Sequence, residues 1–479
     1  MDNKAPVTRK VIPIVPQTGY VPNPVSRFAS NQDIYPRSVS GLFANWRIAM
    51  VYVTQLVFYG LPWLEWGQRQ AVLFDLGARR FYIFGLMLYP QDFIYLAGFL
   101  VIAALALFLF TTVAGRLWCG YTCPQTVYTE IFLWIEKKLE GDRSARMRRD
   151  AQPLSIDKVG RKTAKYGVWL AVGLWTGFTF VGYFTPIKEL GTEFLQMSMS
   201  SWEIFWTLFY GMATYGNAGF MRELMCKHIC PYAQFQSVMF DKDTLIVTYD
   251  TERGEPRGAR SRKADASILN LGSCVDCSLC VQVCPTGIDI RHGLQHDCIG
   301  CGACVDVCDT VMDKLGYARG LIKYSTENAM TQGWTQAQTL RQVLRPRVLI
   351  YAAVLSAIVL ATVLSLMMRT PFKVNVMRDR GVMAREMQDG SIENVYRIQV
   401  MNATESPQRY KITVSGQPGL LVTSDNVVSV PSSQEQGVPV RVQAPPNAMA
   451  PGSHAIQFEI DSLDSPGHLR EKSAFLVPR

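Results

Sequence analysis

Twelve cysteines are the residues of this 479-residue chain whose type and spacing point most directly to chemistry. Eight of them lie between positions 274 and 308, in two runs that each follow the pattern Cys-x2-Cys-x2-Cys-x3-Cys. In such runs three closely spaced thiolates wrap one corner of a [4Fe-4S] cluster, and the fourth cysteine reaches the other cluster. The predicted ligands are Cys274, Cys277, Cys280 and Cys308 for a first cluster and Cys298, Cys301, Cys304 and Cys284 for a second.

The alternative for this segment is structural zinc. Zinc sites usually take two separated Cys-x2-Cys pairs, and such a site would leave half of these thiols without a metal. The spacing is instead that of bacterial two-cluster ferredoxins, although Asp309 stands where a proline usually follows the second run. We therefore expect residues 241–345 to form a ferredoxin domain whose clusters carry single electrons.

The remaining four cysteines occur in a repeated motif, Cys-x3-Cys-Pro, as Cys119 and Cys123 and as Cys226 and Cys230. Residues four apart lie on one face of a helix, so each pair is expected to present its sulfurs side by side, and the proline limits the preceding helix. Soft thiolates select Cu(I), zinc or iron-sulfur clusters, and the two pairs together supply up to four sulfurs. Cycling of each pair as a disulfide, and four buried unreactive cysteines, are the alternatives. His228 lies inside the second pair and is a further candidate ligand.

Apolar stretches of the chain would position these motifs at a membrane. A bilayer span needs about 20 mostly apolar residues, because the helix must satisfy every backbone polar group internally. Five stretches without Asp, Glu, Lys or Arg approach that length, and we predict that they are transmembrane helices: residues 48–64, 93–114, 166–184, 204–220 and 348–368. A shorter apolar patch at residues 81–89 is predicted to be interfacial or re-entrant.

The distribution of charge predicts the topology. The chain carries 48 Lys and Arg against 39 Asp and Glu, a net charge of +9. Basic residues crowd residues 137–165, whereas Lys188 is the only basic residue between the third and fourth predicted spans. By the positive-inside rule the N-terminus and the long loops are cytoplasmic, and residues 370–479 are periplasmic. The basic excess therefore indicates topology rather than nucleic-acid binding. Residues 1–44 contain six prolines and no signal-peptide core, and we predict a disordered cytoplasmic tail.

Beyond the last predicted span the hydrophobic pattern has a period of two. The alternating residues are Tyr396, Ile398 and Val400; Tyr410, Ile412 and Val414; Val438, Val440 and Val442; and Ile456, Phe458 and Ile460. Short alternating strands separated by turns predict an immunoglobulin-like β-sandwich at residues 370–479, without the disulfide of antibody domains. The predicted fold is thus a multi-domain membrane protein: an α-helical transmembrane bundle of five spans, with four helices at 45–240 and the fifth at 346–369, an inserted ferredoxin domain at 241–345, and the all-β sandwich.

Several common cofactor sites are missing from the sequence. No predicted span contains a histidine, so the paired axial ligands of a membrane b-type haem are absent. The sequence also has no G-x-G-x-x-G after a strand and no Walker-type loop, so neither nicotinamide chemistry nor ATP hydrolysis is indicated.

Six further segments are distinctive: Tyr35-Pro-Arg-Ser-Val-Ser-Gly41, Gly60-Leu-Pro-Trp63, Arg79-Arg-Phe-Tyr-Ile-Phe-Gly85, Gly115-Arg-Leu-Trp-Cys-Gly-Tyr-Thr-Cys-Pro124, Phe178-Thr-Phe-Val-Gly-Tyr-Phe-Thr-Pro186 and Ile392-Glu-Asn-Val-Tyr396. With the cysteine runs they resemble the CcoG family, also called FixG or RdxA, from about Tyr35 to the C-terminus. Members of that family are inner-membrane accessory proteins for assembly of the cbb(3)-type cytochrome c oxidase in Gram-negative bacteria.

The resemblance implies a role for both sets of cysteines. The family is associated with reduction of Cu(II) to Cu(I) for the oxidase, with two [4Fe-4S] clusters as electron carriers. Carried over, the cysteines from Cys274 to Cys308 hold the clusters, and Cys119, Cys123, Cys226 and Cys230 handle copper as a substrate or transient ligand. The implied partners are membrane lipid, a copper transporter or chaperone, and oxidase assembly factors. The electron donor is not identified, and a homodimer is compatible with the sequence.

Two other functions are compatible with the same motifs. The chain also resembles the NapH and NosR families, which share the doubled Cys-x3-Cys-Pro motif and pass quinol electrons to another acceptor. In the third alternative the protein is a non-redox assembly scaffold whose β-domain is the essential part. Substitution of Cys119 and Cys226 separates these functions, because only the scaffold predicts normal oxidase assembly without both thiols.

Overall fold

The computed structural model describes residues 34–67, 69–260, 269–378, 384–446 and 448–478, in two compact units. Unit 1 comprises Met1–Leu64 and Phe99–Ala357, and unit 2 comprises Glu65–Gly98 and Ile358–Arg479. The boundaries between the units fall inside two long helices, α3 (Phe93–Ala114) and α17 (Pro346–Met367). Disorder was predicted for residues 1–44, of which residues 1–33 lie outside the described residues. In the described part, Tyr35 donates a hydrogen bond of 2.9 Å to Asp150, and α2 begins at Leu42.

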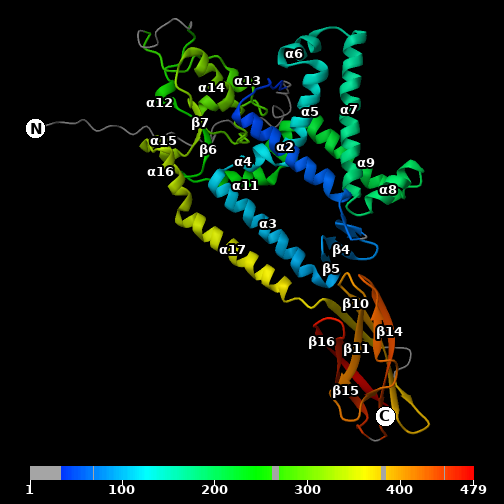
Figure 1. The fold of residues 1–479 in the computed structure, drawn as a ribbon. Helices are drawn as coiled ribbons and strands as arrows, with labels where there is room; N and C mark the ends of the chain where they lie inside the picture. Colours follow the sequence, from blue (N-terminus) through cyan, green and yellow to red (C-terminus); the bar gives the residue numbers. More distant parts are fainter. Residues whose placement is uncertain (1–33, 68, 261–268, 379–383, 447, 479) are drawn as a thin grey trace, which may run out of the picture. The chain divides into compact units, whose positions relative to one another are not determined.

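Unit 1 begins with a group of helices that carries both Cys-x3-Cys-Pro motifs (Figure 1). After α2 (Leu42–Gly60) and α3 these are α4 (Leu117–Tyr121), α5 (Pro124–Glu140), α6 (Arg143–Ala151), α7 (Ile156–Val181), α8 (Ile187–Leu195), α9 (Ser201–Gly219), α10 (Arg222–Leu224), the π-helix η3 (Met225–Ile229) and α11 (Pro231–Met239). Helices α7 and α9 run side by side because glycines let their backbones approach: a Cβ on Gly177 would lie 2.1 Å from the carbonyl oxygen of Thr207. The buried carboxylate of Glu136 in α5 binds Arg146 and Arg222, and these ion pairs tie α5 to α6 and α10.

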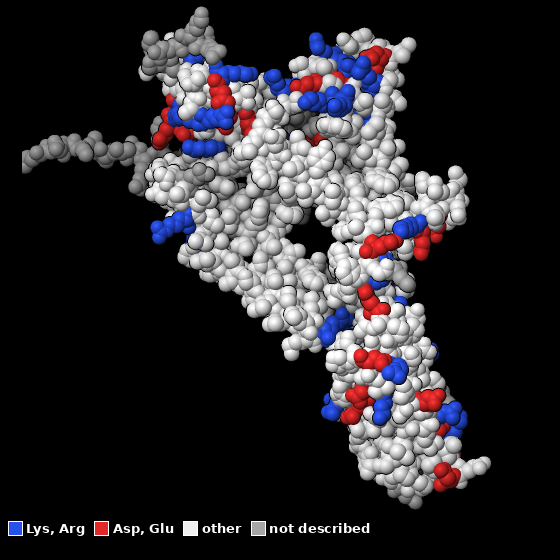
Figure 2. All heavy atoms as spheres, viewed as in Figure 1, with Lys and Arg blue, Asp and Glu red and all other residues white. Residues whose placement is uncertain are grey.

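Among the described residues, two helices, rather than the predicted five, are long and apolar enough to cross a membrane: residues Pro90–Ala114, which include α3, and Pro346–Met367, which form α17. Figure 2 shows both helices free of charged residues between their ends, whereas Lys and Arg gather over α5, α6 and the start of α7. The other three predicted stretches form α2, α7 and α9. They are less apolar because α2 includes Arg47, α7 includes Lys165, and all three are rich in Trp, Tyr and Gly.

The second part of unit 1 is the ferredoxin-like segment between α11 and α17. Strands β6 (Ile246–Tyr249) and β7 (Ile322–Ser325) pair antiparallel. Between them in the sequence lie α12 (Thr251–Gly254), α13 (Leu279–Gln282) and α14 (Ala303–Leu315). After β7 come α15 (Glu327–Gln332) and α16 (Gln336–Arg341). Asp306 of α14 accepts hydrogen bonds from the backbone N–H groups of Phe43, at 3.1 Å, and Ala44, at 2.7 Å. A side chain of the ferredoxin-like segment therefore caps the N-terminus of α2.

Unit 2 contains the C-terminal sandwich of two antiparallel sheets (Figure 1). One sheet has the order β12 (Leu421–Val422), β14 (Glu435–Ala444), β10 (Ile392–Asn402) and β8 (Phe372–Arg378), with β9 (Arg385–Glu386) beside β10. The other has the order β13 (Val427–Val430), β11 (Gln408–Ser415), β15 (Gly452–Ser462) and β16 (His468–Val477). The predicted alternation is confirmed, because Tyr396, Ile398 and Val400 are fully buried in the core between the sheets.

Residues 81–89, predicted to be interfacial or re-entrant, form strands of a sheet rather than a re-entrant segment. Strands β4 (Arg80–Ile83) and β5 (Leu86–Leu88) continue a three-stranded sheet that begins with β3 (Val72–Asp75). Tyr89 then donates a hydrogen bond of 3.2 Å to the carbonyl oxygen of Asn402, and Leu73, Tyr82, Met87 and Tyr89 bury their side chains with Met401. Tyr82, Met87, Leu88 and Tyr89 are buried, so the apolar side chains of this patch pack into a protein core.

Candidate iron-sulfur and thiol site

The predicted first-cluster ligands line one cavity in the ferredoxin-like segment. Cys274, Cys277, Cys280 and Cys308 surround it, and we call these four residues the first cradle. Cys280 comes from α13 and Cys308 from α14, which brings the fourth cysteine of the second run to the first. Burial raises the pKa of the Cys280 thiol to about 11 and that of Cys308 to about 12. Cys277 is exposed.

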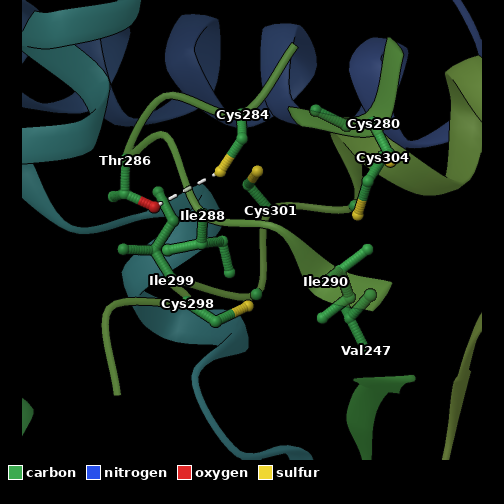
Figure 3. Close-up of a pocket in the computed structure, with 13 residues that line it drawn as sticks. Val247, Cys280, Cys284, Thr286, Ile288, Ile290, Cys298, Ile299, Cys301 and Cys304 are labelled. Carbon is green, nitrogen blue, oxygen red and sulfur yellow. Dashed lines mark hydrogen bonds between the residues drawn. The ribbon is translucent and has the colours of Figure 1, made fainter. Parts of the chain in front are cut away.

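The predicted second-cluster ligands line a neighbouring cavity (Figure 3). Cys298, Cys301, Cys304 and Cys284 form this second cradle, and Cys280 of the first cradle also lines it. The turn between Cys298 and Cys304 depends on Gly300 and Gly302, whose positive φ values of 66° and 71° suit glycine. Burial raises the pKa of Cys298 to about 12 and that of Cys304 well above its usual range.

The donor set of each cradle fits a [4Fe-4S] cluster, since four thiols surround each cavity. Each iron of such a cluster takes one cysteine, so the four sulfurs need not converge on a single point. Accordingly, within the described ranges no three His, Cys, Asp or Glu side chains come together as ligands of one metal ion. Because burial favours the protonated thiols, loading of a metal must release protons from these cysteines.

The Cys-x3-Cys-Pro pairs do not share one helix face as predicted. Cys119 lies in α4, whereas Cys123 is the N-cap of α5, with Pro124 at the first helical position. Cys226 lies in the π-helix η3, and Cys230 is the N-cap of α11. The proline therefore starts the next helix, where its missing N–H costs nothing, and each pair straddles a junction between two helices.

The two pairs lie close enough to influence one another. Burial, together with negative charge on Cys123 and Cys226, raises the pKa of Cys119 to about 12. Burial raises the pKa of Cys226 to about 11, again with contributions from Cys123 and Cys230. The thiol of Cys119 also donates to the buried amide oxygen of Gln236, at 3.4 Å. His228 is exposed.

The thiol pairs contact the second cradle directly. Cys119 and Cys226 pack against one buried cluster formed by Val283, Ile299, Cys301 and Ala303. Gly120, next to Cys119, approaches the same loop so closely that an added Cβ would lie 2.8 Å from the carbonyl oxygen of Gly300 and 2.9 Å from the Cα of Cys301. The fold therefore places both Cys-x3-Cys-Pro motifs on the second cradle.

Arg116 lies between the thiols and the second cradle. Its buried guanidinium donates to the carbonyl oxygens of Ala233, at 2.6 Å, Cys298, at 3.3 Å, and His296. Burial lowers the pKa of Arg116, and the neighbouring Cys119, Cys298 and Cys226 oppose that change. Arg116 supplies positive charge beside sulfurs that are anionic when a metal is bound.

Arg116, Gly120 and Arg47 were not identified as site residues from the sequence. Arg47 of α2 donates to the carbonyl oxygen of Cys301 at 3.3 Å. An arginine and a glycine within three residues of Cys119 were the available signals, but nothing local shows that either residue faces a cluster loop almost 200 positions away.

Comparisons with known proteins agree with these observations. Three family profiles match: "4Fe-4S dicluster domain" over residues 221–327, "4Fe-4S binding domain" over 96–141, and "IG-like fold at C-terminal of FixG" over 362–478. The first two profiles each include one Cys-x3-Cys-Pro motif. The chain is 38% identical over 422 residues to the nitrogen fixation protein FixG of Rhizobium meliloti. The aligned region covers 82% of this chain and 80% of that protein.

Other proteins are similar to most or to part of this chain. Protein RdxB of Cereibacter sphaeroides is 38% identical over 421 residues, 85% of this chain and 88% of that protein. The ferredoxin-type protein NapH of Haemophilus influenzae is 22% identical over 205 residues, 39% of this chain and 65% of that protein. A crystal structure of a FixG-related protein from Vibrio parahaemolyticus matches 22% of this chain and 97% of that chain, with 23% identity and a TM-score of 0.21.

Proposed function

The chain belongs to the FixG/RdxA/RdxB family of iron-sulfur proteins, and from this premise we propose that it reduces Cu(II) to Cu(I) for assembly of a cbb(3)-type cytochrome c oxidase. One observation supports this function most directly: Cys119 and Cys226 pack against Cys301 and its neighbours in the second cradle. A copper ion held by these thiols would therefore lie beside a one-electron carrier.

The two cradles are the proposed cluster sites. Cys274, Cys277, Cys280 and Cys308 hold the first [4Fe-4S] cluster, and Cys298, Cys301, Cys304 and Cys284 hold the second. When bound, the clusters supply single electrons. The grouping of Cys308 with the first run and of Cys284 with the second supports this crosswise assignment.

Cys119, Cys123, Cys226 and Cys230 are the proposed copper-handling residues. Thiolates stabilise Cu(I) more than Cu(II), so copper held by them becomes easier to reduce. The mutual effect of the two pairs on their pKa values supports a shared site. Exposure of His228 favours a copper site made of sulfur alone. The Cu(I) product then passes to a copper transporter or chaperone that serves oxidase assembly.

We also propose that the protein lies in the bacterial inner membrane, with the ferredoxin-like segment in the cytoplasm and the C-terminal domain in the periplasm. The basic surface over α5, α6 and α7 supports a cytoplasmic location for that side of unit 1. Packing of Tyr89 on Asn402 supports a common location for residues 65–92 and the C-terminal domain. Those segments precede α3 and follow α17, as expected when both helices cross the membrane.

Addition of Cu(II) to anaerobically reduced holoprotein tests this function. We expect cluster absorbance to change toward the oxidised state while a chelator traps one Cu(I) for each electron lost. A variant with serine in place of Cys119, Cys123, Cys226 and Cys230 should lose this reaction, whereas Met225→Leu, which removes a neighbouring thioether, should retain it. Ferricyanide, a non-specific oxidant, should still oxidise the clusters of both variants. Equal Cu(I) formation by the four-serine variant would refute the copper role of these thiols.

The two alternatives make different predictions in cells. A scaffold would support oxidase assembly after Cys119→Ser and Cys226→Ser, whereas a redox protein would not. Added copper should restore assembly in a strain that lacks only the reductase. Failure of copper to do so, together with loss of assembly in the serine variants, would favour electron transfer to another acceptor.

A further inference from the structure

Unit 1 contains a cavity of about 660 Å³ that neither the cradles nor the thiol pairs account for. Helices α2, α5 and α7 form three of its walls, and the segment around Cys284 contributes to a fourth. Small-molecule sites in proteins typically have volumes of about 300–1,000 Å³. The cavity is therefore large enough for an organic ring with substituents.

The lining of this cavity has an apolar and a polar part. Val51, Val172 and the rings of Tyr59, Trp134 and Trp175 supply the apolar part. The polar part consists of Arg37, Ser38, Arg47, Gln55, Glu130, Lys137, Asp142 and Arg146. An apolar and aromatic lining with a few polar groups is typical of sites that hold an aromatic ligand in one orientation.

Three lining residues carry buried polar atoms without a hydrogen-bond partner among the described residues. These atoms are the amide oxygen Oε1 of Gln55 and the Nε–H groups of Arg47 and Arg146. Both arginines are more than nine-tenths buried, with exposed fractions of 7% and 6%. Buried polar atoms are usually paired, so these three atoms are unsatisfied hydrogen-bonding groups of residues in the wall of the cavity. A phenolic hydroxyl can donate to Gln55 and accept from an arginine.

The outer face of α2 indicates how such a ligand would enter. Tyr52, which lines the cavity, is 71% exposed, and its neighbours Val53, Leu56 and Val57 are exposed as well. A continuous exposed apolar face marks contact with lipid or with an apolar ligand. A molecule with a polar ring and an apolar tail fits a cavity next to this face.

The cavity also reaches the second cradle. Val283 and Pro285, which flank Cys284, both line it. Arg47, another lining residue, donates to the carbonyl oxygen of Cys301 at 3.3 Å. A ligand in the cavity would therefore contact the immediate neighbours of a predicted cluster ligand, which is the place expected for an electron donor.

We propose that this cavity binds a membrane quinol, whose oxidation supplies the electrons for copper reduction. This inference rests on one part of the proposed function, namely that the two cradles hold iron-sulfur clusters. The quinol loses both O–H protons and two electrons and becomes a quinone. Each cluster takes one electron, and Cys280, which lines both cradle cavities, lies between the two acceptors. The protons leave to water by way of Glu130, whose side chain is 35% exposed. One quinol therefore accounts for two Cu(II) ions reduced.

The first experiment measures binding without reference to activity. A photoreactive quinone analogue is cross-linked to the holoprotein, and the modified peptides are mapped. We expect labelling of α2, α5 or α7 that excess unlabelled quinone prevents. Val51→Trp fills the cavity and should reduce labelling by about tenfold or more, whereas Val53→Trp, on the same helix but outside the lining, should leave it within about twofold. Equal labelling of the two variants would overturn the site, and so would displacement of the label by phospholipid but not by quinone.

The second experiment separates this inference from the proposed function. A soluble quinol is added to oxidised protein, and cluster reduction is followed by absorbance; Val51→Trp should slow it by about tenfold or more, and Val53→Trp should not. Dithionite should reduce the clusters of both variants, and both should then reduce Cu(II). If dithionite reduced the clusters of the unmodified protein but quinol did not, the quinol site would be wrong. The proposed copper reduction would be unaffected by that result. Gln55→Leu, which keeps the side-chain volume, repeats the comparison if Val51→Trp loses iron, and unchanged quinol binding in that variant would also count against the site.

Discussion

The two cradles have the same cysteine spacing but different surroundings. The first is enclosed by the ferredoxin-like segment itself, and its Cys277 is exposed. The second is covered by α2 and α4, which contribute Arg47, Arg116 and Gly120. Only the second contacts the Cys-x3-Cys-Pro thiols and the proposed quinol cavity. The internal symmetry of the module is therefore broken by what packs on it, and the second cradle is the one placed to exchange electrons with the rest of unit 1.

The largest effect is expected where α4 touches the second cradle. In Gly120→Ala the new methyl group would lie within 3 Å of three backbone atoms of the loop at residues 299–301, so the loop must shift. We expect the free energy of unfolding to fall by about 3 kcal/mol. We also expect the electron paramagnetic resonance signal of the second cluster to disappear. Gly216→Ala is the control, because a Cβ there meets nothing within 4 Å. Retention of both cluster signals in Gly120→Ala would show that this contact does not hold the second cradle.

The next effect compares one arginine beside each cradle. Arg116 lies beside Cys298, and Arg291 lines the first cradle, where it pairs with Asp289 and Asp276. Removal of a positive charge disfavours the reduced, more negative cluster. Arg116→Met should therefore lower the second cluster's reduction potential by roughly 60 mV, a tenfold change for a one-electron couple, and Arg291→Met should lower that of the first. A redox titration measures both, and equal shifts of both clusters in each variant would contradict the asymmetry.

A smaller effect concerns the cap that joins α14 to α2. Asp306→Ala removes the acceptor of the Phe43 and Ala44 N–H groups, and we expect a loss of about 1 kcal/mol in the free energy of unfolding. Asp313→Ala, on the same helix but in an exposed ion pair with Arg319, should cost less. Unfolding followed through cluster absorbance measures the difference. Similar costs for the two variants would mean that the cap contributes little to docking.

The smallest effect is a pH dependence confined to the first cradle. The hydrogen bonds from Arg291 lower the pKa of Asp289 below its usual 3.8. This stabilisation is present above pH 3.8 and is lost as the pH falls through the lower pKa of the folded state. Asp289→Asn should therefore destabilise the protein by less than about 1 kcal/mol at neutral pH, and the difference from the unmodified protein should shrink on acidification. Thermal unfolding of the two proteins, at neutral pH and at a pH below 3.8, measures this difference in stability. A difference that stays constant between the two pH values would contradict the proposed role of the Asp289–Arg291 pair.

Local patterns predicted some elements well. The alternation of Tyr396, Ile398 and Val400 identified the buried face of β10, because a strand sends successive side chains to opposite sides. The same kind of reasoning failed at Cys123 and Cys230. A spacing of four residues suits one continuous helix, but the proline after each cysteine starts a new helix instead, and no count of residues distinguishes these two outcomes.

Apolar composition was a weaker guide. The apolar composition of residues 81–89 predicts an interfacial or re-entrant segment, whereas Tyr82, Met87 and Tyr89 pack in a core with Met401, more than 300 positions away. Composition shows that a segment avoids water, but it does not distinguish lipid from a protein core as the alternative environment. The same limit explains an overestimate of the number of membrane spans. Five apolar stretches were predicted to be spans, but among the described residues only two helices are long and apolar enough to cross a membrane.

From the sequence alone it was possible to predict the eight cysteines of the cradles and their division into two sets, and to recognise the family of the chain. This was possible because cluster ligation demands particular side chains at short, regular intervals. The packing of Cys119 and Cys226 on the second cradle, and the cavity beside Cys284, became visible in the three-dimensional structure and not in the sequence. Those features arise where distant segments pack together, and their contacts depend on the complementary shapes of whole elements, which no local spacing encodes.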